Sequence, residues 1–312
     1  MIQIDDVSRY FGPNAAVESL SLTVERGSIV TLVGTSGSGK STVLRMINRL
    51  IEPTSGAIFI EGRDTRTIPG EKLRRGIGYV IQGHGLFPHW TVARNVATVP
   101  HLLNWDAARI EKRVNELLVL FGLDPAVHAR KFPHQLSGGQ QQRVGVARAL
   151  AAEPSVLLMD EPFGALDPII RAKGREDLLA LQRRLEVTIV LVTHDMEEAI
   201  ALGDRIAVMD RGRLLQYATP AEILTRPAPG FVERLIGDSE RPFRLLSLTK
   251  VSAAAEPGEA AGPSISETAS LRDALSELIA RGAESLPVAA ADGAPRGRVA
   301  LAAILARARL AS

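Results

Sequence analysis

The stretch Gly34-Thr35-Ser36-Gly37-Ser38-Gly39-Lys40-Ser41 decides the fold, because it fits the pattern G-x-x-x-x-G-K-[ST] at every position. An apolar run at residues 28–33 precedes it, and apolar residues recur at helical spacing over residues 40–50. The pattern therefore lies between an expected strand and an expected helix, as a phosphate-binding loop must. Its glycines allow backbone N–H groups to face a polyphosphate, Lys40 can reach the β- and γ-phosphates, and Ser41 can bind Mg²⁺.

Strand-like and helix-like segments alternate around this loop. Residues 155–159 and 188–193 are two further apolar runs, each followed by a helical pattern. Such alternation predicts an α/β fold with a mostly parallel sheet covered by helices. Between residues 92 and 152 the strand character fades, so we expect an inserted helical subdomain there. Residues 205–217 contain two short apolar runs around Arg211-Gly212, which predicts a hairpin.

Composition excludes several classes of protein. The chain has 312 residues, room for about two domains, and 46% hydrophobic and 23% charged residues, which is typical of globular proteins. It has no cysteine, which excludes disulfides, cysteine-based zinc sites and a cysteine nucleophile. With 37 basic and 35 acidic residues, the net charge of +2 does not indicate a nucleic-acid partner. We expect neither a signal peptide nor a membrane-spanning helix, since no apolar run approaches about 20 residues.

Two acids follow the apolar run at residues 156–159. Asp160 would hold Mg²⁺, whose oxygen shell needs a carboxylate beside the phosphates, and Glu161 would face the attacking water. Alone, such a run is often only a strand that ends in an acid. The phosphate-binding loop elsewhere in the chain favours the catalytic interpretation.

A second anion site is expected at Leu136-Ser137-Gly138-Gly139-Gln140, directly before a helix predicted over residues 141–152. One domain rarely needs two phosphate cradles for one nucleotide, whereas two chains facing head to tail could each lend this element to the other's nucleotide. A plain helix N-cap is the alternative. The position of the element after the phosphate loop and before Asp160 favours the first interpretation.

In this order of motifs the chain resembles the ATP-binding subunits of ABC transporters, over about residues 1–248. The resemblance is carried by the phosphate loop, Gln82, residues 136–140, Asp160-Glu161, Ala165-Leu166-Asp167 and His194. It is most similar to subunits of importers for glycine betaine, choline, proline and related quaternary amines. That narrower likeness is carried by the phrases at residues 85–90, 97–100, 133–136 and 244–248.

The resemblance implies a P-loop NTPase fold of the ABC type, an ATPase domain at residues 1–240 and a helical subdomain at about 92–152. It implies an ATP hydrolase that uses ATP and Mg²⁺, works as a homodimer and drives osmoprotectant import through separate transmembrane permease subunits. A substrate-binding protein would act indirectly, and the chain would lie at the cytoplasmic face of the membrane. Residues 82–90 would dock the permease helices. The alternatives are import of another solute, such as an amino acid, or export.

Roles for individual residues also follow from the resemblance. Phe11 would stack on adenine, with Tyr10 as its competitor, and Asp167 would cross the dimer interface. Their structural alternatives are a core phenylalanine and a helix N-cap. The expected site comprises Glu161, His194 and Gln82 in catalysis; Phe11, Gly34, Thr35, Ser36, Gly37, Ser38, Gly39, Lys40, Ser41 and Thr42 on ATP; Leu136, Ser137, Gly138, Gly139 and Gln140 in trans; Asp167 at the interface; and Ser41, Gln82 and Asp160 around the metal.

The C-terminal part has a different composition. Residues 241–264 are expected to be a linker, because residues 251–263 are built mostly from Ala, Glu, Gly, Pro and Ser. Residues 265–312 resemble a single CBS motif, a small α/β unit that works in pairs. An amphipathic helix capped by Ser270 and two short strands are predicted there. Such a small segment carries little apolar surface, so we expect Leu271, Leu275 and Leu278 to pack against a second copy. A degenerate tail is the alternative.

Overall fold

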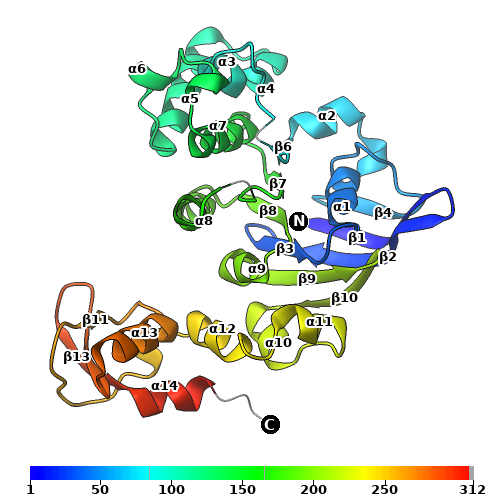
Figure 1. Cartoon of the computed structure of the whole chain (residues 1–312). Coiled ribbons are helices and arrows are strands. Elements are labelled where there is room, and N and C mark those ends of the chain that lie inside the picture. The colour runs from blue at the N-terminus through cyan, green and yellow to red at the C-terminus, as the bar shows by residue number, and fades with distance from the viewer. Residues whose placement is uncertain (84, 165, 309–312) are drawn as a thin grey trace. The chain divides into compact units, whose positions relative to one another are not determined.

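The chain forms two compact units, Met1–Tyr217 and Ala218–Ser312, in a computed structural model that describes residues 1–83, 85–164 and 166–308 (Figure 1). His84 of the expected docking segment, Ala165 and residues 309–312 lie outside the described residues. No helix in the described ranges is long and apolar enough to cross a membrane.

A six-stranded sheet forms the centre of the first unit (Figure 1). Its strands are β3 (Ile29–Val33), β6 (Ile77–Val80), β7 (Val156–Asp160), β8 (Thr188–Thr193), β9 (Arg205–Asp210) and β10 (Arg213–Ala218). They lie in the order β10-β9-β3-β8-β7-β6. Strand β3 pairs in parallel with β8 and β9, and β7 pairs in parallel with β6 and β8. The mostly parallel sheet and the hairpin of β9 and β10 are therefore confirmed.

Both faces of this sheet are buried. In β7, Val156 and Leu158 belong to one apolar core, whereas Leu157 and Met159 belong to the other. Side chains in a strand alternate between the two faces, so a strand covered on both sides reads as a continuous apolar run. This is why the central strands could be recognised from the sequence.

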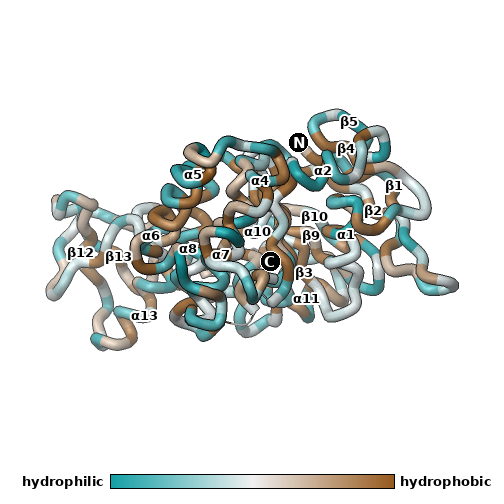
Figure 2. The backbone as a smooth tube through the Cα atoms, turned by 90° about the horizontal axis from the view of Figure 1, so that it is seen from above, coloured by the Kyte–Doolittle hydropathy of each residue, from teal (hydrophilic) through white to brown (hydrophobic). Residues whose placement is uncertain are grey.

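The helices of the first unit either pack on this sheet or form the helical segment between residues 92 and 150 (Figure 1). They are α1 (Lys40–Ile47), α2 (Gly70–Arg75), α3 (Val92–Val96), α4 (Thr98–Leu102), α5 (Ala107–Leu120), α6 (Pro125–His128), α7 (Gly138–Leu150), α8 (Pro168–Leu185) and α9 (Met196–Leu202), with short 3-10 helices η1 (Thr65–Thr67) and η2 (Pro133–Gln135). Between residues 92 and 150 the structure is helical and contains no strand, as expected. Hydrophobic and hydrophilic residues alternate along the tube of α5 (Figure 2), and its apolar residues Ile110, Val114, Leu117 and Leu118, which recur at helical spacing, are buried.

A second sheet of the first unit was not predicted. Strands β1 (Ile2–Phe11), β2 (Asn14–Val24), β4 (Ser55–Ile60) and β5 (Arg63–Asp64) form an antiparallel sheet in the order β2-β1-β4-β5. Its signal is present in β2, where buried Leu20, Leu22 and Val24 alternate with exposed residues.

The second unit contains short helices and one three-stranded sheet. Its elements are α10 (Pro220–Thr225), α11 (Phe231–Ile236), α12 (Arg241–Leu248), η3 (Val251–Ala253), β11 (Ile265–Ser266), α13 (Leu271–Arg281), β12 (Ser285–Ala289), β13 (Pro295–Ala300) and α14 (Leu301–Ala308). Strand β12 pairs in parallel with β11 and antiparallel with β13. The two strands predicted from the sequence are β12 and β13. The predicted cap is also observed, because the Ser270 hydroxyl accepts a hydrogen bond from the backbone N–H of Asp273 at 3.1 Å.

The apolar face of α13 is buried within this chain, so the expectation that it packs against a second copy is wrong. Leu271, Leu275 and Leu278 are 0%, 8% and 1% exposed and share a core with residues of β12, β13 and α14. The segment expected as a linker supplies part of that core. Helix α12 contributes Leu246, and η3 contributes Val251. The unit can bury its own apolar surface because it begins before residue 265, and its additional helical residues contribute to the core.

Candidate nucleotide site

The predicted site residues meet at one edge of the central sheet. The phosphate loop follows Val33, Gln82 follows β6, Asp160 ends β7, and His194 follows β8. The register places Val33 opposite Thr193, and Asp160 opposite Val192. Because the carboxyl ends of parallel strands share one edge, residues far apart in the sequence become neighbours there.

The phosphate loop is held closely by its surroundings. A side chain at Gly34 would overlap the carbonyl oxygen of Met209 at the end of β9, and one at Gly39 would overlap the carbonyl oxygen of Ala16 in β2. Gly39 also has a φ of 100°, which L residues rarely adopt. Ser36 and Gly37 are exposed at the rim of the loop. The loop therefore presents its backbone outward, and only glycine fits at the two contact positions.

Lys40 lies inside the loop that it terminates. The residue is 5% exposed, and its ammonium donates hydrogen bonds to the carbonyl oxygens of Gly34 and Thr35 at 2.8 and 2.7 Å. Burial lowers the pKa of Lys40, while the nearby carboxylates of Glu161 and Asp160 act in the opposite direction. The charge of Lys40 is thus placed where a polyphosphate held by the loop amides would meet it.

Ser41 and Asp160 form a pair of oxygen donors beside the loop. The Ser41 hydroxyl donates a hydrogen bond to Oδ1 of Asp160 at 2.8 Å, and Asp160 is 6% exposed. Burial raises the pKa of Asp160, whereas the hydrogen bond from Ser41 lowers it. A hydroxyl and a carboxylate at this spacing suit a hard cation such as Mg²⁺, which prefers oxygen ligands. A cation at this position would also favour the ionised carboxylate.

Two of the three predicted catalytic residues, Gln82 and His194, contact the same carboxylate oxygen of the third, Glu161. Oε2 of Glu161 accepts a hydrogen bond from Nε2 of Gln82 at 3.3 Å and lies 3.5 Å from Nδ1 of His194. Glu161 has a φ of 47°, which is uncommon for a residue with a side chain, and its N–H donates to the Val192 carbonyl oxygen at 3.0 Å. The side chain of Glu161 is 24% exposed, so this carboxylate can meet water while its backbone stays fixed.

Residues 136–140 form the N-terminus of α7. The Ser137 hydroxyl accepts a hydrogen bond from the Gln140 N–H at 3.3 Å, and Oε1 of Gln140 accepts one from the Ser137 N–H at 3.0 Å. The helix begins at Gly138, three residues earlier than expected. Within residues 1–83, 85–164 and 166–308, no hydrogen bond or ion pair joins this element to the phosphate loop. The structure therefore does not bring this element together with the loop in a single chain.

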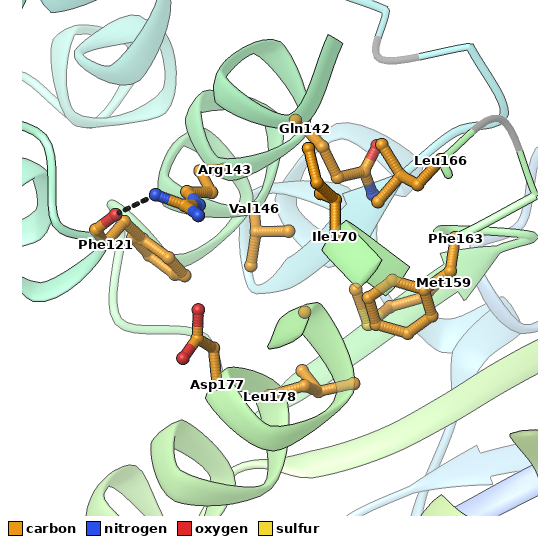
Figure 3. A pocket seen from close by; sticks show the side chains of 12 residues that line it. Phe121, Gln142, Arg143, Val146, Met159, Phe163, Leu166, Ile170, Asp177 and Leu178 are labelled. Carbon is orange, nitrogen blue, oxygen red and sulfur yellow. Dashed lines mark hydrogen bonds between the residues drawn. The ribbon is translucent and has the colours of Figure 1, made fainter. Parts of the chain in front are cut away.

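Asp167 stands at the start of α8. Its Oδ1 accepts a hydrogen bond from the Ile170 N–H at 3.1 Å, which is the N-cap arrangement. Ile170 lines a small cavity of about 40 Å³ together with Gly139 and Gln142 of α7. Figure 3 shows Gln142, Leu166 and Ile170 at one end of this cavity, and Phe121 and Asp177 at the other. The first turn of α8 therefore lies against the helix that begins with the second anion element.

Phe11 is not a core residue. It ends β1 and is 48% exposed, and the guanidinium carbon of Arg9 lies 4.5 Å from the centroid of its ring. Tyr10 is 40% exposed on the same strand. The structure thus leaves both aromatic side chains accessible.

Two carboxyl groups near the site were not predicted. Oδ1 of Asp210 accepts a hydrogen bond from the Thr35 hydroxyl at 3.4 Å. The sequence could have indicated this residue, because Asp210 is an acid at the end of an apolar strand, and that strand lies beside β3. Glu198 in α9 is 4% exposed, and burial with the nearby Asp195 carboxylate raises its pKa to about 7. The burial of Glu198 depends on how α9 packs and could not be predicted from the sequence.

Comparisons with known proteins identify the family of the chain. A family profile described as "ABC transporter" matches residues 17–164. The chain is 52% identical to the glycine betaine uptake system ATP-binding protein YehX of Escherichia coli, over 95% of this chain and 96% of that one. It is 48% identical to the glycine betaine/carnitine/choline transport ATP-binding protein OpuCA of Bacillus subtilis, over 82% of this chain and 70% of that one.

A solved structure is also similar. It is the dimeric structure of a post-hydrolysis state of the ATP-binding cassette MJ0796 bound to ADP and Pi. The TM-score is 0.63 at 34% identity, and the match covers 70% of this chain and 99% of that chain.

Proposed function

The chain belongs to the family of ABC transporter ATP-binding proteins, and we propose that it hydrolyses ATP to drive osmoprotectant import through separate transmembrane subunits. The observation that carries the catalytic part is the convergence of Gln82 and His194 on Oε2 of Glu161, beside the phosphate loop. The names of the similar proteins YehX and OpuCA support glycine betaine or related quaternary amines as the solute.

ATP would be bound by the loop from Gly34 to Thr42. The loop amides and the N-terminus of α1 would hold the phosphates, and Phe11 would stack on adenine. The Lys40 ammonium would exchange the carbonyl oxygens of Gly34 and Thr35 for phosphate oxygens. These two carbonyl bonds hold the charge in position before the nucleotide arrives.

Ser41 and Asp160 would hold Mg²⁺, with Gln82 beside them. When bound, the ion neutralises negative charge that develops on the transferred phosphoryl group. The 2.8 Å bond between the Ser41 hydroxyl and Asp160 supports this assignment, since both oxygens already lie within reach of one small ion.

Glu161 would orient the attacking water and accept its proton. A general base must lie within hydrogen-bond reach of that proton, and the fixed backbone of Glu161 together with its partly exposed carboxylate supports this role. His194 would contact the γ-phosphate, and Gln82 would help to orient the water. Because both already contact the carboxylate of Glu161, movement of either side chain would change the position of the base.

Two copies of the chain would complete each site. Ser137 and Gly139, with Leu136, Gly138 and Gln140, would bind the nucleotide of the partner copy. The absence of any bond from this element to the loop of its own chain, among the described residues, supports this role. The dimeric structure of MJ0796 supports it as well. Asp167 would then lie at the interface, and a dimer that closes on a triphosphate becomes a two-state switch.

The remaining partners would be membrane proteins. Permease subunits would dock at residues 82–90 and keep the chain at the cytoplasmic face, while a substrate-binding protein would act only through them. The ATPase domain would occupy residues 1–240, with its helical subdomain at about 92–152. Residues 265–312 would form a single CBS-like segment, to whose core Leu246 and Val251 of the preceding residues also contribute. The helix and strands of the second unit support that last likeness.

Uptake of labelled solutes tests the proposal. A strain that lacks this subunit should recover uptake of labelled glycine betaine when it receives the wild-type gene, and should not recover it with Glu161→Gln. Labelled amino acids should enter at the same rate in all three strains. Restored uptake of an amino acid without restored uptake of glycine betaine would instead support the alternative solute class.

Mixed dimers test the shared site. Ser137→Arg and Lys40→Ala chains should each be inactive alone. In a mixed head-to-tail dimer, one site carries both changes and the other carries neither, so mixing should restore part of the activity. If it does not, a crosslink from position 137 to the partner's phosphate loop decides whether the element acts in trans.

A further inference from the structure

The exposed ring of Phe11 has a cation on one face. The guanidinium carbon of Arg9 lies 4.5 Å from the ring centroid, which is within the range of a cation–π interaction. This contact places the side chains of Arg9 and Phe11 on the same side of the strand. Since Phe11 remains 48% exposed, part of the ring is covered and part is open to solvent.

Arg9 is itself held in place. Its Nη1 donates a hydrogen bond to the carbonyl oxygen of Glu52 at 3.0 Å. The Glu52 carboxylate accepts a hydrogen bond from Nε of Arg49 at 2.7 Å, and Arg49 lies two residues beyond the end of α1. Nε of Arg9 is buried and has no hydrogen-bond partner within the described ranges. The guanidinium is therefore fixed by one backbone bond and by the aromatic ring.

The pair of strands that carries the ring also contacts the phosphate loop. Phe11 pairs with Asn14 across the turn between β1 and β2, and two residues further along β2 the Ala16 carbonyl oxygen meets Gly39. Two residues of a strand span about 7 Å. The same guanidinium thus connects this ring with the far end of α1, the helix whose N-terminus would bind the phosphates.

We propose that Arg9 is a positioning residue that holds Phe11 for stacking on the adenine base. This inference rests on the proposed function, in which Phe11 is the base-binding residue. The cation lowers the electron density of the ring on which the electron-rich base stacks, and it fixes the ring before the base arrives. Arg9 acts on the base and not on the phosphates, because its polar contacts go to Glu52 and not to the loop.

Binding measurements on the full chain separate these contributions. The variants are Arg9→Met, Arg9→Lys, Phe11→Leu and the double variant Arg9→Met with Phe11→Leu. The matched control is Arg26→Met, because Arg26 is an arginine of the same unit in an exposed ion pair with Glu61. The ligands are ATP and inorganic tripolyphosphate, which has no base. Arg9→Met should weaken ATP binding about two- to fivefold, the effect of an exposed cation–π pair, and leave tripolyphosphate binding unchanged. Arg9→Lys should restore part of the affinity, and Arg26→Met should have no effect.

The double variant decides whether Arg9 acts through the ring. Adding Arg9→Met to Phe11→Leu should weaken ATP binding no further. An equal loss in both backgrounds, or an equal loss for tripolyphosphate, would show that Arg9 supports the fold through Glu52 and would overturn the proposal. If Phe11→Leu itself leaves ATP binding unchanged, the base-stacking role fails first, and the role of Arg9 fails with it.

Discussion

Ionisation of Glu198 should make the first unit less stable as the pH rises from 4.5 to about 7. The carboxyl group is 4% exposed, its Oε1 has no hydrogen-bond partner among the described residues, and burial raises its pKa from 4.5 to about 7. Between these two pH values the folded state binds the proton more tightly than the unfolded state, so stability falls as the pH rises. The pKa difference of about 2.5 corresponds to roughly 3 kcal/mol, which is fully lost above pH 7.

The variant Glu198→Gln removes this ionisation and keeps the shape of the protonated acid. Urea unfolding of the wild type and the variant should be compared at pH 5 and pH 8. Both tryptophans, Trp90 and Trp105, lie in the first unit, so their fluorescence reports this unit alone. Relative to the wild type, the variant should gain up to about 3 kcal/mol of unfolding free energy between pH 5 and pH 8.

The neighbouring Glu197→Gln is the control, because Glu197 is exposed on the same turn of α9. Its stability should change with pH as the wild type's does. If Glu198→Gln also keeps the full pH dependence of the wild type, the buried carboxyl does not carry the penalty and the reasoning is refuted.

Two further substitutions test the loop and the second unit. Gly39→Ala should abolish ATP binding, measured by calorimetry, because its side chain would overlap the Ala16 carbonyl oxygen and the residue has a φ of 100°; normal affinity would contradict the close packing of the loop. Leu278→Ala should lower the unfolding free energy of the second unit by about 2–5 kcal/mol, measured by circular dichroism. The exposed Ile279→Ala should change it by less than about 0.5 kcal/mol, and equal effects of the two would contradict a core within the single chain.

The parts of the fold that the sequence predicts are those with a local signal. Strands β7 and β8 are buried on both faces and read as apolar runs, so the parallel sheet is visible. Strand β1 could not be recognised from the sequence. Its pairing with β2 shifts register around Asp5 and Asp6, and this shift interrupts the alternation of buried and exposed side chains. In the second unit, the Ala- and Gly-rich segment after residue 248 suggested a linker, although Val251 is fully buried. Its burial depends on α13, which lies later in the chain.

The candidate site likewise contains residues that the sequence predicts and contacts that it does not. Lys40, Asp160 and Glu161 belong to motifs whose spacing is fixed by one strand or one loop, and the sequence predicts them. The contacts of Thr35 with Asp210 and of Arg9 with Phe11 and Glu52 depend on how separate strands and loops meet. Such contacts have no periodic pattern along the chain, so sequence reasoning does not find them.

The catalytic role of Glu161 is the central claim, and one variant tests it most directly. Glu161→Gln should bind ATP as the wild type does, while its turnover falls by about two to four orders of magnitude, the usual contribution of a general base. Light scattering with ATP and Mg²⁺ should then detect a stable dimer of this variant that ADP does not produce. Turnover at the wild-type rate would contradict the assignment, since hydrolysis would not depend on the carboxylate at which Gln82 and His194 meet.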